Sequence, residues 1–544
     1  MFRYLMKALC LWMMMMMMFF SCSRDESAVS EGTQAKTASS ADKDAAVIRL
    51  EGGDWGYPTP YAHYPRGPGG FKMCLIFDSL LERGPKGLIP WLAEKIEISE
   101  NGKVYVFTIR DGVKWQDGRP LTPEDVRFSI DYAGRHPMTW SYVYGTIDQV
   151  AAGPGNTVKV VLKQPAAPMY YNLGLTRIIP SHIWQDVDRP KEFTAPEALI
   201  GSGPYRLTQY SKEHGTYRFE AFDGFWGPRQ RVRRIEFIPV SEPVLAYENR
   251  TIDLVRISPD LLPRFEKDPE NKIVRSPAFW GYRLLFNMEK AGPLRDRRVR
   301  QAIAHAVDLD ELVAKIARGA AVPGRAGILP PDHVMAADVK AYDYDPRHAE
   351  ALLSEAGYGR ADAAGIRFSV DGSSLEFDLL CSSQEVRMAE ILQQRLSDVG
   401  IGIKVNSVDP KTRDTRVRNH DYRLAVIGHG GWGHDPEYLA AHFSGRLSTL
   451  SSSPSASGLA GFDAPGLEKL LDRQQTEVDP DRRREMIEQI QRLAAEEVPE
   501  IPLFYTTAYN VYRPATYDGW MFMFDHHSLL HSKLSYLERE APQP

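Results

Sequence analysis

Residues 105–118 of the chain read Tyr-Val-Phe-Thr-Ile-Arg-Asp-Gly-Val-Lys-Trp-Gln-Asp-Gly, and residues 121–126 read Leu-Thr-Pro-Glu-Asp-Val. The β-branched and aromatic residues predict a strand over Lys103–Ile109, after a hairpin turn at Asn101-Gly102. A shorter strand is expected over Val113–Trp115, closed by the turn that follows it. Thr122 is then typical of a helix N-cap, because a proline and two acidic residues come directly after it. This succession of strands and a helix indicates a mixed α/β architecture.

The same alternation continues through the rest of the chain. Two predicted strands, Leu375–Leu380 and Ile401–Val405, enclose a helix that ends at Gly400, which is the pattern of a βαβ unit with parallel strands. Three further helices are predicted to start at aspartate residues, namely Asp308, Asp345 and Asp479. A final β-like run covers Leu503–Tyr512.

Length and composition limit the class of protein. The chain has 544 residues, which is too long for one core and predicts at least two lobes. A net charge of −5 and 25% charged residues give no concentrated basic surface, so we expect no nucleic-acid partner. Cys74 and Cys381 lie far apart in the sequence and are expected to be two isolated buried thiols.

The N-terminus has the layout of a secretory signal. Arg3 and Lys7 precede an apolar run that includes six consecutive methionines and ends at Ser21-Cys22. The small residue before Cys22 resembles a bacterial lipobox, in which the cysteine is lipidated. Residues 23–45 are rich in Ser, Ala, Thr, Asp and Lys and are expected to form a flexible tether. The sequence thus predicts a body anchored by lipid on the periplasmic side of the cell envelope, without deciding which membrane holds it.

Several segments resemble extracellular solute-binding protein family 5, the peptide-, nickel- and related substrate-binding proteins of bacterial ABC importers. The matching segments run in the family's order over residues 45–515: Leu88–Lys95, Tyr105–Gly118, Leu121–Val126, Gly201–Tyr205, Phe225–Gly227, Thr251–Asp253, Phe286–Asn287, Arg298–Ala302 and Ala306–Asp308. One such segment is weak evidence, whereas their common order is strong evidence.

The resemblance implies an α/β, two-lobed, periplasmic-binding-protein-like clamp of the large class II type, with an inserted subdomain in the first lobe and two crossing strands. The expected division is 1–22 signal with lipidated Cys22, 23–45 tether, 46–65, 191–274 and 501–544 first lobe, 66–190 inserted subdomain, and 275–500 second lobe. It implies a monomer that binds a small molecule or peptide and passes it to ABC permease subunits with cytoplasmic ATPases. Members of this family bind and do not catalyse, so neither enzymatic activity nor a cofactor is expected.

The strongest candidate for ligand contact is the segment Val426–Glu437, where a strand ends in glycines followed by Trp432. Glycine lets the backbone approach a ligand closely, so Gly431 and Trp432 are predicted to touch it. In peptide-binding relatives an acidic residue after this tryptophan pairs with the ligand's ammonium group. Here that position is deleted and His434 stands in the gap, which argues against a free-amine peptide. Asp435 is expected to cap the helix that begins after Pro436.

Four aromatic residues complete the predicted binding set: Trp55, Tyr57, Trp280 and Tyr282. The first two follow the first strand, Val47–Leu50, where the family's first-lobe loop lies. The other two are near the predicted crossing strand. Because side chains alternate along a strand, Trp280, Tyr282 and Leu284 should share one face and Arg283 the other.

Other interpretations stay open. An oligopeptide-like solute is the main hypothesis, and a nickel or metal-chelate ligand of the same fold is the nearest alternative, with His429 and His434 as weak metal candidates. The tail histidines His526, His527 and His531, after Asp525, are expected to form a solvated surface strip. A tethered sensor component is a further alternative. A hydrolase is the least favoured, since no nucleophile elbow, zinc-protease motif or phosphate loop is present.

Overall fold

The computed structural model describes residues 44–63, 67–136, 142–290, 292–430, 433, 435–444, 459–464 and 466–538. The predicted signal, Cys22 and nearly all of the predicted tether lie outside these residues. The first strand, β1, already begins at Ala45, the last residue that the sequence assigned to the tether. Within the described part of the chain, no helix has both the length and the apolar character that crossing a bilayer requires.

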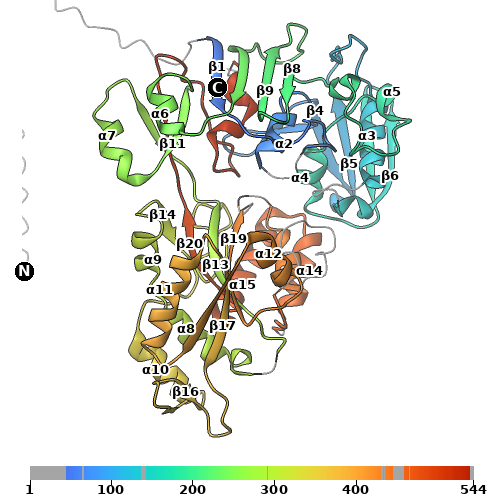
Figure 1. Ribbon diagram of the computed structural model, residues 1–544. Coiled ribbons are helices and arrows are strands. Elements are labelled where there is room, and N and C mark those ends of the chain that lie inside the picture. Colours follow the sequence, from blue (N-terminus) through green and yellow to red (C-terminus); the bar gives the residue numbers. More distant parts are fainter. Residues whose placement is uncertain are drawn as a thin grey trace, which may run out of the picture. The chain divides into compact units, whose positions relative to one another are not determined.

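The first lobe contains a four-stranded sheet and a small three-stranded sheet (Figure 1). Across the larger sheet the strands are β1 (Ala45–Glu51), β10 (Val232–Ile238), β9 (Thr216–Ala221) and β8 (Tyr205–Ser211). The smaller sheet has β11 (Leu254–Ile257), β21 (Tyr509–Tyr512) and β12 (Lys272–Arg275), with α6 (Pro243–Glu248) and α7 (Leu262–Glu266) near it. At β21 the chain thus returns to a sheet whose other strands come before residue 276.

A second four-stranded antiparallel sheet forms within residues 66–190, the predicted insertion. Its strands, in order, are β4 (Ala93–Ser99), β5 (Val104–Ile109), β7 (Thr157–Leu162) and β6 (Ile147–Gly153). Other elements here are α2 (Gly67–Met73), β2 (Leu81–Arg83), β3 (Leu88–Pro90), α3 (Pro123–Arg135), α4 (Met169–Gly174) and α5 (Ser181–Trp184). A short 3₁₀ turn, η3 (Pro196–Leu199), follows.

The segment 103–126 folds largely as predicted. The strand over Lys103–Ile109 is confirmed as β5, and α3 starts at Pro123 after Thr122, whose backbone N–H donates to Asp125 at 2.9 Å. The predicted strand Val113–Trp115 is wrong, because only an isolated bridge between Lys114 and Pro120 forms there. Proline has no N–H to extend such a ladder.

The second lobe is built on one six-stranded sheet, and both faces of this sheet are covered by helices. Its order is β14 (Ala321–Pro323), β20 (Glu500–Thr506), β13 (Trp280–Phe286), β19 (Leu424–Gly430), β17 (Glu376–Ser382) and β18 (Gly402–Val408). The helices are α8 (Arg297–Ala306), α9 (Leu309–Lys315), α10 (Pro346–Glu355), α11 (Val386–Ser397), α12 (Pro410–Arg418), α13 (Tyr438–Ser444), α14 (Leu467–Thr476) and α15 (Pro480–Glu497).

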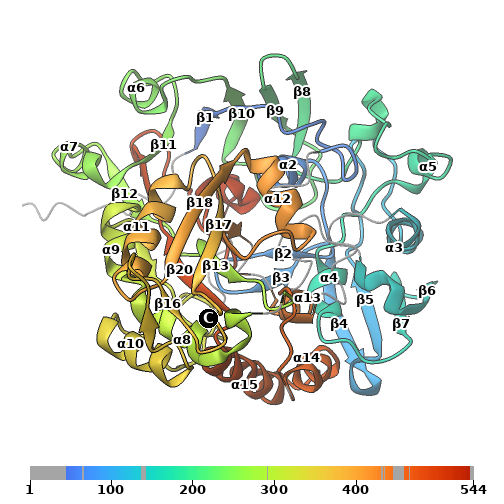
Figure 2. The same cartoon turned by 60° about the horizontal axis from the view of Figure 1, so that its bottom comes forward.

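Successive residues of the second-lobe strands lie on opposite faces of the sheet and pack in two different hydrophobic cores. Leu284 and Leu379 join the core that α8, α10 and α11 cover, whereas Leu285 and Leu380 join the core of α13, α14 and α15. Figure 2 shows these two helix groups around the sheet. The predicted βαβ unit is confirmed, since β17 and β18 pair in parallel around α11.

Two connections cross between the lobes. The chain leaves the small first-lobe sheet after β12 and enters the large sheet at β13, and it returns from β20 to β21. The single strand predicted over Leu503–Tyr512 is therefore two strands in different sheets. Residues 501–506, which the sequence-based division gave to the first lobe, pair with β13 and belong to the second-lobe sheet. Pro502 lies where the β13–β20 register shifts, a place in a sheet that tolerates proline.

Local predictions elsewhere are confirmed. Asp308, Asp345 and Asp479 each accept a hydrogen bond from a backbone N–H in the first turn of their helices, at 2.9–3.0 Å. Cys74 and Cys381 are both free and buried.

Candidate ligand-binding site

The second-lobe sheet gathers candidate binding groups at one edge. The parallel strands β17, β18 and β19 end there, at Ser382, Val408 and Gly430. Because β13 and β20 run antiparallel to β19 and β13 respectively, β13 begins and β20 ends at this same edge. Ligands in open α/β sheets bind outside the carboxyl ends of the strands. It is also the edge from which both connections leave for the first lobe.

Trp280 and Tyr282 lie on this edge and share a face, as the alternation predicts. Their rings meet edge to face at 4.8 Å, and Tyr282 also contacts Phe504 at 5.4 Å. A Cβ added to Gly428 or Gly430 would lie 2.7 or 2.6 Å from the Trp280 indole. These two glycines therefore make room for Trp280. Both aromatic rings remain partly exposed.

A polar group lies beside these rings. Glu385 accepts a hydrogen bond from the Ser382 backbone N–H at 2.6 Å and pairs with Arg413 at 2.5 Å. Burial raises the pKa of Tyr282, and the Glu385 carboxylate raises it further, whereas Arg413 opposes the change. Tyr282 is thus a neutral phenol at physiological pH and can donate or accept a hydrogen bond.

Arg283 lies on the opposite face of the same strand, as predicted, and is buried there. It approaches Glu500 at 3.3 Å, and His442 of α13 contacts the same carboxylate oxygen at 3.0 Å. Burial alone would raise the pKa of Glu500, but Arg283 and His442 outweigh it and lower that pKa. This ionic group fixes α13 against the sheet.

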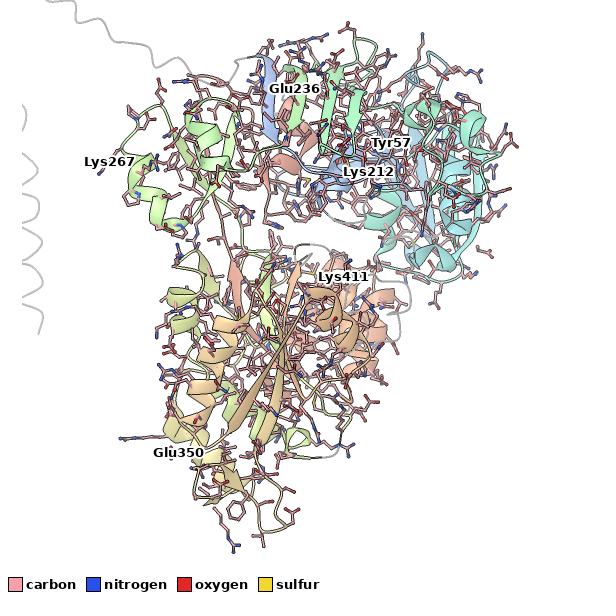
Figure 3. All side chains as sticks on the ribbon, in the orientation of Figure 1. Tyr57, Lys212, Glu236, Lys267, Glu350 and Lys411 are labelled. Atoms are coloured by element: carbon pink, nitrogen blue, oxygen red, sulfur yellow. The ribbon has the colours of Figure 1, made fainter. Side chains whose placement is uncertain are left out.

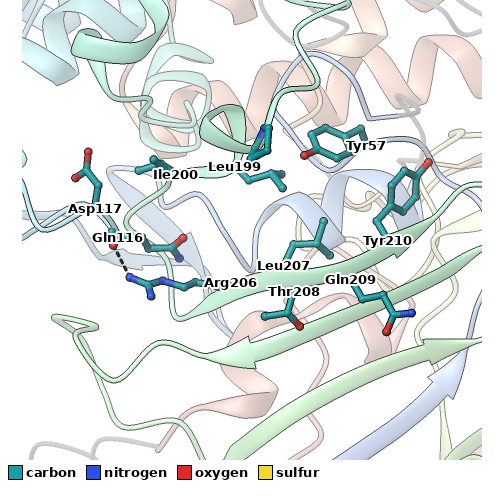
Figure 4. A pocket seen from close by; sticks show the side chains of 11 residues that line it. Tyr57, Gln116, Asp117, Leu199, Ile200, Arg206, Leu207, Thr208, Gln209 and Tyr210 are labelled. Carbon is teal, nitrogen blue, oxygen red and sulfur yellow. Dashed lines mark hydrogen bonds between the residues drawn. The ribbon is translucent and has the colours of Figure 1, made fainter.

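In the first lobe, residues 52–57 follow β1 and hold the predicted residues Trp55 and Tyr57. The Trp55 backbone N–H donates to the Tyr217 hydroxyl at 2.9 Å. Tyr57 meets Tyr210 edge to face at 5.7 Å and lines a cavity of about 540 Å³ (Figure 4). The other lining residues are Gln116, Asp117, Pro196, Leu199, Ile200, Arg206, Leu207, Thr208 and Gln209. All of them belong to the first lobe, so Tyr57 walls a cavity that the second lobe does not line.

The C-terminal histidines do not form the solvated strip that the sequence predicts. His531 stacks on Phe71 of α2 with the ring centroids 4.3 Å apart, and His526 lies 4.7 Å from the same ring. The two imidazoles share a hydrogen bond of 2.6 Å between Nε2 of His526 and Nδ1 of His531. All three rings are half-buried. Figure 1 shows the red C-terminal segment close to α2.

The two lobes touch at several points near these groups. A Cβ on Gly433, in the loop after β19, would lie 2.1 Å from the Asp525 carbonyl oxygen, so the two backbones are in contact. The Ala167 N–H donates to the Gln475 carbonyl at 2.8 Å. Asp435 is structural as expected, because it accepts from the Glu437 N–H at 3.0 Å and pairs through both carboxylate oxygens with Arg483.

The other predicted site residues follow or end strand β19. Gly431, Trp432 and His434 are outside the described residues, and of His429 only the backbone, in β19 opposite Gly281, is described. In the part of the chain that the structure describes, no group of three or more His, Cys, Asp or Glu side chains could hold a metal ion.

Comparison with known proteins agrees with this architecture. The family model for "Bacterial extracellular solute-binding proteins, family 5 Middle" matches residues 87–448. The dipeptide-binding protein of Escherichia coli K12 is 28% identical over 469 residues, which cover 80% of this chain and 85% of that protein. The nickel-binding periplasmic protein of the same organism is 27% identical, covering 82% and 86%.

Among solved structures, NikA from Brucella suis in complex with Fe(III)-EDTA superposes with a TM-score of 0.77. It is 25% identical in sequence, and the match covers 91% of this chain and all of that one. The likeness therefore extends over both lobes.

Proposed function

Because the chain belongs to the bacterial extracellular solute-binding proteins of family 5, we propose that it captures a small solute between its two lobes. It then delivers this solute unaltered to the membrane permease of an ABC importer. The proposal includes transmembrane permease subunits and their cytoplasmic ATPases as partners, and a monomeric binding protein. It includes no catalytic step, in keeping with relatives that are binding proteins.

The observation that carries the proposal is the edge of the second-lobe sheet. Partly exposed aromatic rings, Trp280 and Tyr282, lie there beside hydrogen-bonding groups, where both interlobe connections leave. Aromatic walls with a few oriented polar groups are the usual lining of a solute site. Closure of two lobes about such a site is a hinge transition in which the ligand selects the closed state.

An oligopeptide-like solute is our first candidate ligand, supported by the similarity to the dipeptide-binding protein. A metal chelate is the second candidate. It is favoured by the histidine at position 434, where peptide-binding relatives are expected to have an acidic residue, and by the similarity to the nickel-binding protein. The proposed contact residues are Trp432, Gly431, His434, Trp280, Tyr282, Trp55 and Tyr57, with His429 a weaker metal candidate.

The test is capture of a ligand. Native mass spectrometry of the protein purified from its own organism should find one retained small molecule, and that molecule should raise the melting temperature without being converted. Trp432→Ala should weaken its binding about thirtyfold or more, because loss of a packed aromatic anchor costs about 2–4 kcal/mol. Chemical conversion of the ligand would contradict the proposal, and unchanged affinity in Trp432→Ala would remove that residue from the site.

We also propose that Cys22 is lipidated and that residues 23–44 tether the body to a membrane. In cells, Cys22→Ser should release the protein from the membrane fraction into the soluble periplasmic fraction. Retention of the variant in the membrane fraction would contradict lipid anchoring while leaving solute binding unaffected.

A further inference from the structure

The cavity beside Tyr57 follows the edge of strand β8. Its lining includes five consecutive residues of this strand, 206–210. Successive side chains of a strand point to opposite faces, so a cavity that touches all five of them runs along the edge and not over one face. Figure 4 shows Leu207 directed to one side of the strand and Thr208 and Gln209 to the other. Among the described strands β8 pairs with β9 alone, at the end of its sheet.

Backbone groups of β8 face this cavity. At the first residue of the strand, the Tyr205 N–H donates to the Leu75 carbonyl at 3.1 Å, and the Tyr205 carbonyl accepts from the Gln116 side chain at 2.8 Å. Both backbone groups of Tyr205 therefore point away from β9. In an antiparallel ladder this direction repeats at every second residue, so the N–H and C=O of Leu207 point the same way, into the cavity. An edge with such groups is a template for a further strand.

An irregularity of β8 brings two aromatic rings together at one end of the cavity. The register with β9 shifts between Leu207 and Gln209. Residues 207 and 210 would lie on opposite faces of a regular strand, yet both pack against the same hydrophobic core. The shift therefore turns Tyr210 towards Tyr57, and the two rings meet edge to face at 5.7 Å. Bulges at sheet edges and beside functional sites commonly redirect a side chain in this way.

The Tyr57 hydroxyl is a hydrogen-bond donor at this end. Figure 3 shows Tyr57 in the first lobe near Lys212, the residue that follows β8. The hydroxyl points into the cavity (Figure 4) and has no hydrogen-bond partner among the described residues, whereas the Tyr210 hydroxyl donates to Asp54 at 2.7 Å. Burial raises the pKa of Tyr57, and the Glu197 carboxylate raises it further. The hydroxyl is thus protonated at neutral pH and can donate to a ligand.

The other sides of the cavity limit what it can hold. Gln116 and Asp117 lie at the end away from Tyr57, and Leu199 and Ile200 lie across from β8 (Figure 4). Five extended residues span about 17 Å, since a strand rises about 3.3 Å per residue. The volume of about 540 Å³ is within the usual range of sites for small ligands. The groove therefore fits a short extended chain.

We propose that this cavity is a second ligand site, which binds a free peptide of about five residues as an added strand beside β8. The backbone groups of Leu207 hydrogen-bond to the peptide backbone, and the rings of Tyr57 and Tyr210 contact its side chains. Recognition through the backbone tolerates many side chains. All the lining residues belong to the first lobe, so binding here is independent of solute capture between the lobes.

The first test locates peptide binding with a variant that fills the groove. The probe is a mixture of acetylated and amidated pentapeptides built from valine, threonine, tyrosine and lysine. After incubation and gel filtration, mass spectrometry identifies the peptides that the protein retains. Leu199→Trp fills the groove from the side across from β8 and should abolish retention. Leu245→Trp is the matched control and should retain peptides as wild type does, because Leu245 is 54% exposed on α6, outside the groove. Circular dichroism checks that both variants fold.

The second test uses wild type alone. Each retained peptide is made with N-methyl groups at its residues 2 and 4, or at its residues 3 and 5. Only alternate N–H groups of an added strand face β8, so one series should bind about tenfold more weakly and the other like the parent peptide, as measured by fluorescence anisotropy. Equal binding of the two series, unchanged retention by Leu199→Trp, or retention of no pentapeptide by wild type overturns the peptide site. Each of these outcomes leaves solute capture between the lobes standing.

Discussion

The Lys72 side chain places its ammonium group in an apolar environment, a combination that most proteins avoid. Its position between Phe237 and Tyr217 gives a cation–π attraction, which compensates only part of the desolvation. A lysine kept for folding would be expected to have an acidic partner, as Lys533 has in the same lobe. Among the described residues no acidic side chain takes this place beside Lys72, so burial alone acts on its pKa.

Lys72→Met should stabilise the ligand-free protein, most strongly at neutral and acid pH. The folded pKa, about 7, is below the unfolded value of 10.5, so the unfolded chain binds the proton more tightly. The resulting penalty is complete below pH 7 and fades as pH rises to 10.5. A difference of about 3.5 pKa units sets an upper limit of about 5 kcal/mol. Urea unfolding at several pH values measures it, and a variant effect that is independent of pH would contradict the lowered pKa.

Trp280 shows how a side chain at the site depends on a neighbouring element. Its indole lies on β19, and the strand accommodates it only because residues 428 and 430 are glycines. The glycines thus belong to the packing of an aromatic wall.

Gly428→Ala should therefore displace Trp280 and weaken solute binding. The added methyl would lie 2.7 Å from the indole, so the ring or the strand must shift, at a cost of about 1–3 kcal/mol in unfolding free energy. Tryptophan fluorescence and urea unfolding measure the displacement and the cost. Gly359→Ala is the matched control, because a Cβ there meets nothing within 4 Å. Wild-type affinity in Gly428→Ala would show that Trp280 is not part of the binding surface.

Elements with local signals could be predicted from the sequence, and elements set by distant contacts could not. The helices after Asp308 and Asp479 follow from capping residues within a few positions of their starts. Leu503–Tyr512 is uniformly β-forming, so no local signal marks where it leaves one sheet for another. The shared face of Trp280 and Tyr282 was predicted from strand alternation. The packing of His526 and His531 on Phe71 was missed, because these residues come from opposite ends of the chain.

At the scale of the whole molecule, the C-terminal segment completes the first lobe through buried charges. Lys533 lies 2.6 Å from Asp78 and 2.7 Å from Glu82, and Arg177 approaches Glu82 at 3.6 Å. The Trp91 indole N–H also donates to Asp78 at 2.7 Å. Residues after β21 are thus fixed to the region around β2, which places His526 and His531 next to α2.

Lys533→Met should detach this segment and destabilise the protein by about 3–5 kcal/mol, because Asp78 and Glu82 would remain buried with one cation fewer. Urea unfolding of the full chain measures the loss. Lys267→Met, which removes an exposed lysine, should leave the unfolding midpoint unchanged. A Lys533→Met protein as stable as wild type would show that the ionic group does not hold the segment in place.

Low pH should destabilise the protein through this same ionic group. Burial by itself would raise the pKa of Glu82, but Lys533 and Arg177 outweigh it and lower the pKa to about 2, from 4.5. The stability that this carboxylate contributes, about 3 kcal/mol for a difference of about 2.5 units, is complete above pH 4.5 and is lost as pH falls towards 2. In Lys533→Met the pKa of Glu82 rises, so acid unfolding followed by circular dichroism should begin at higher pH than in wild type. Identical acid midpoints for the two proteins would mean that Lys533 does not hold the Glu82 carboxylate in its charged form, and the C-terminal segment would then owe its position to apolar packing alone.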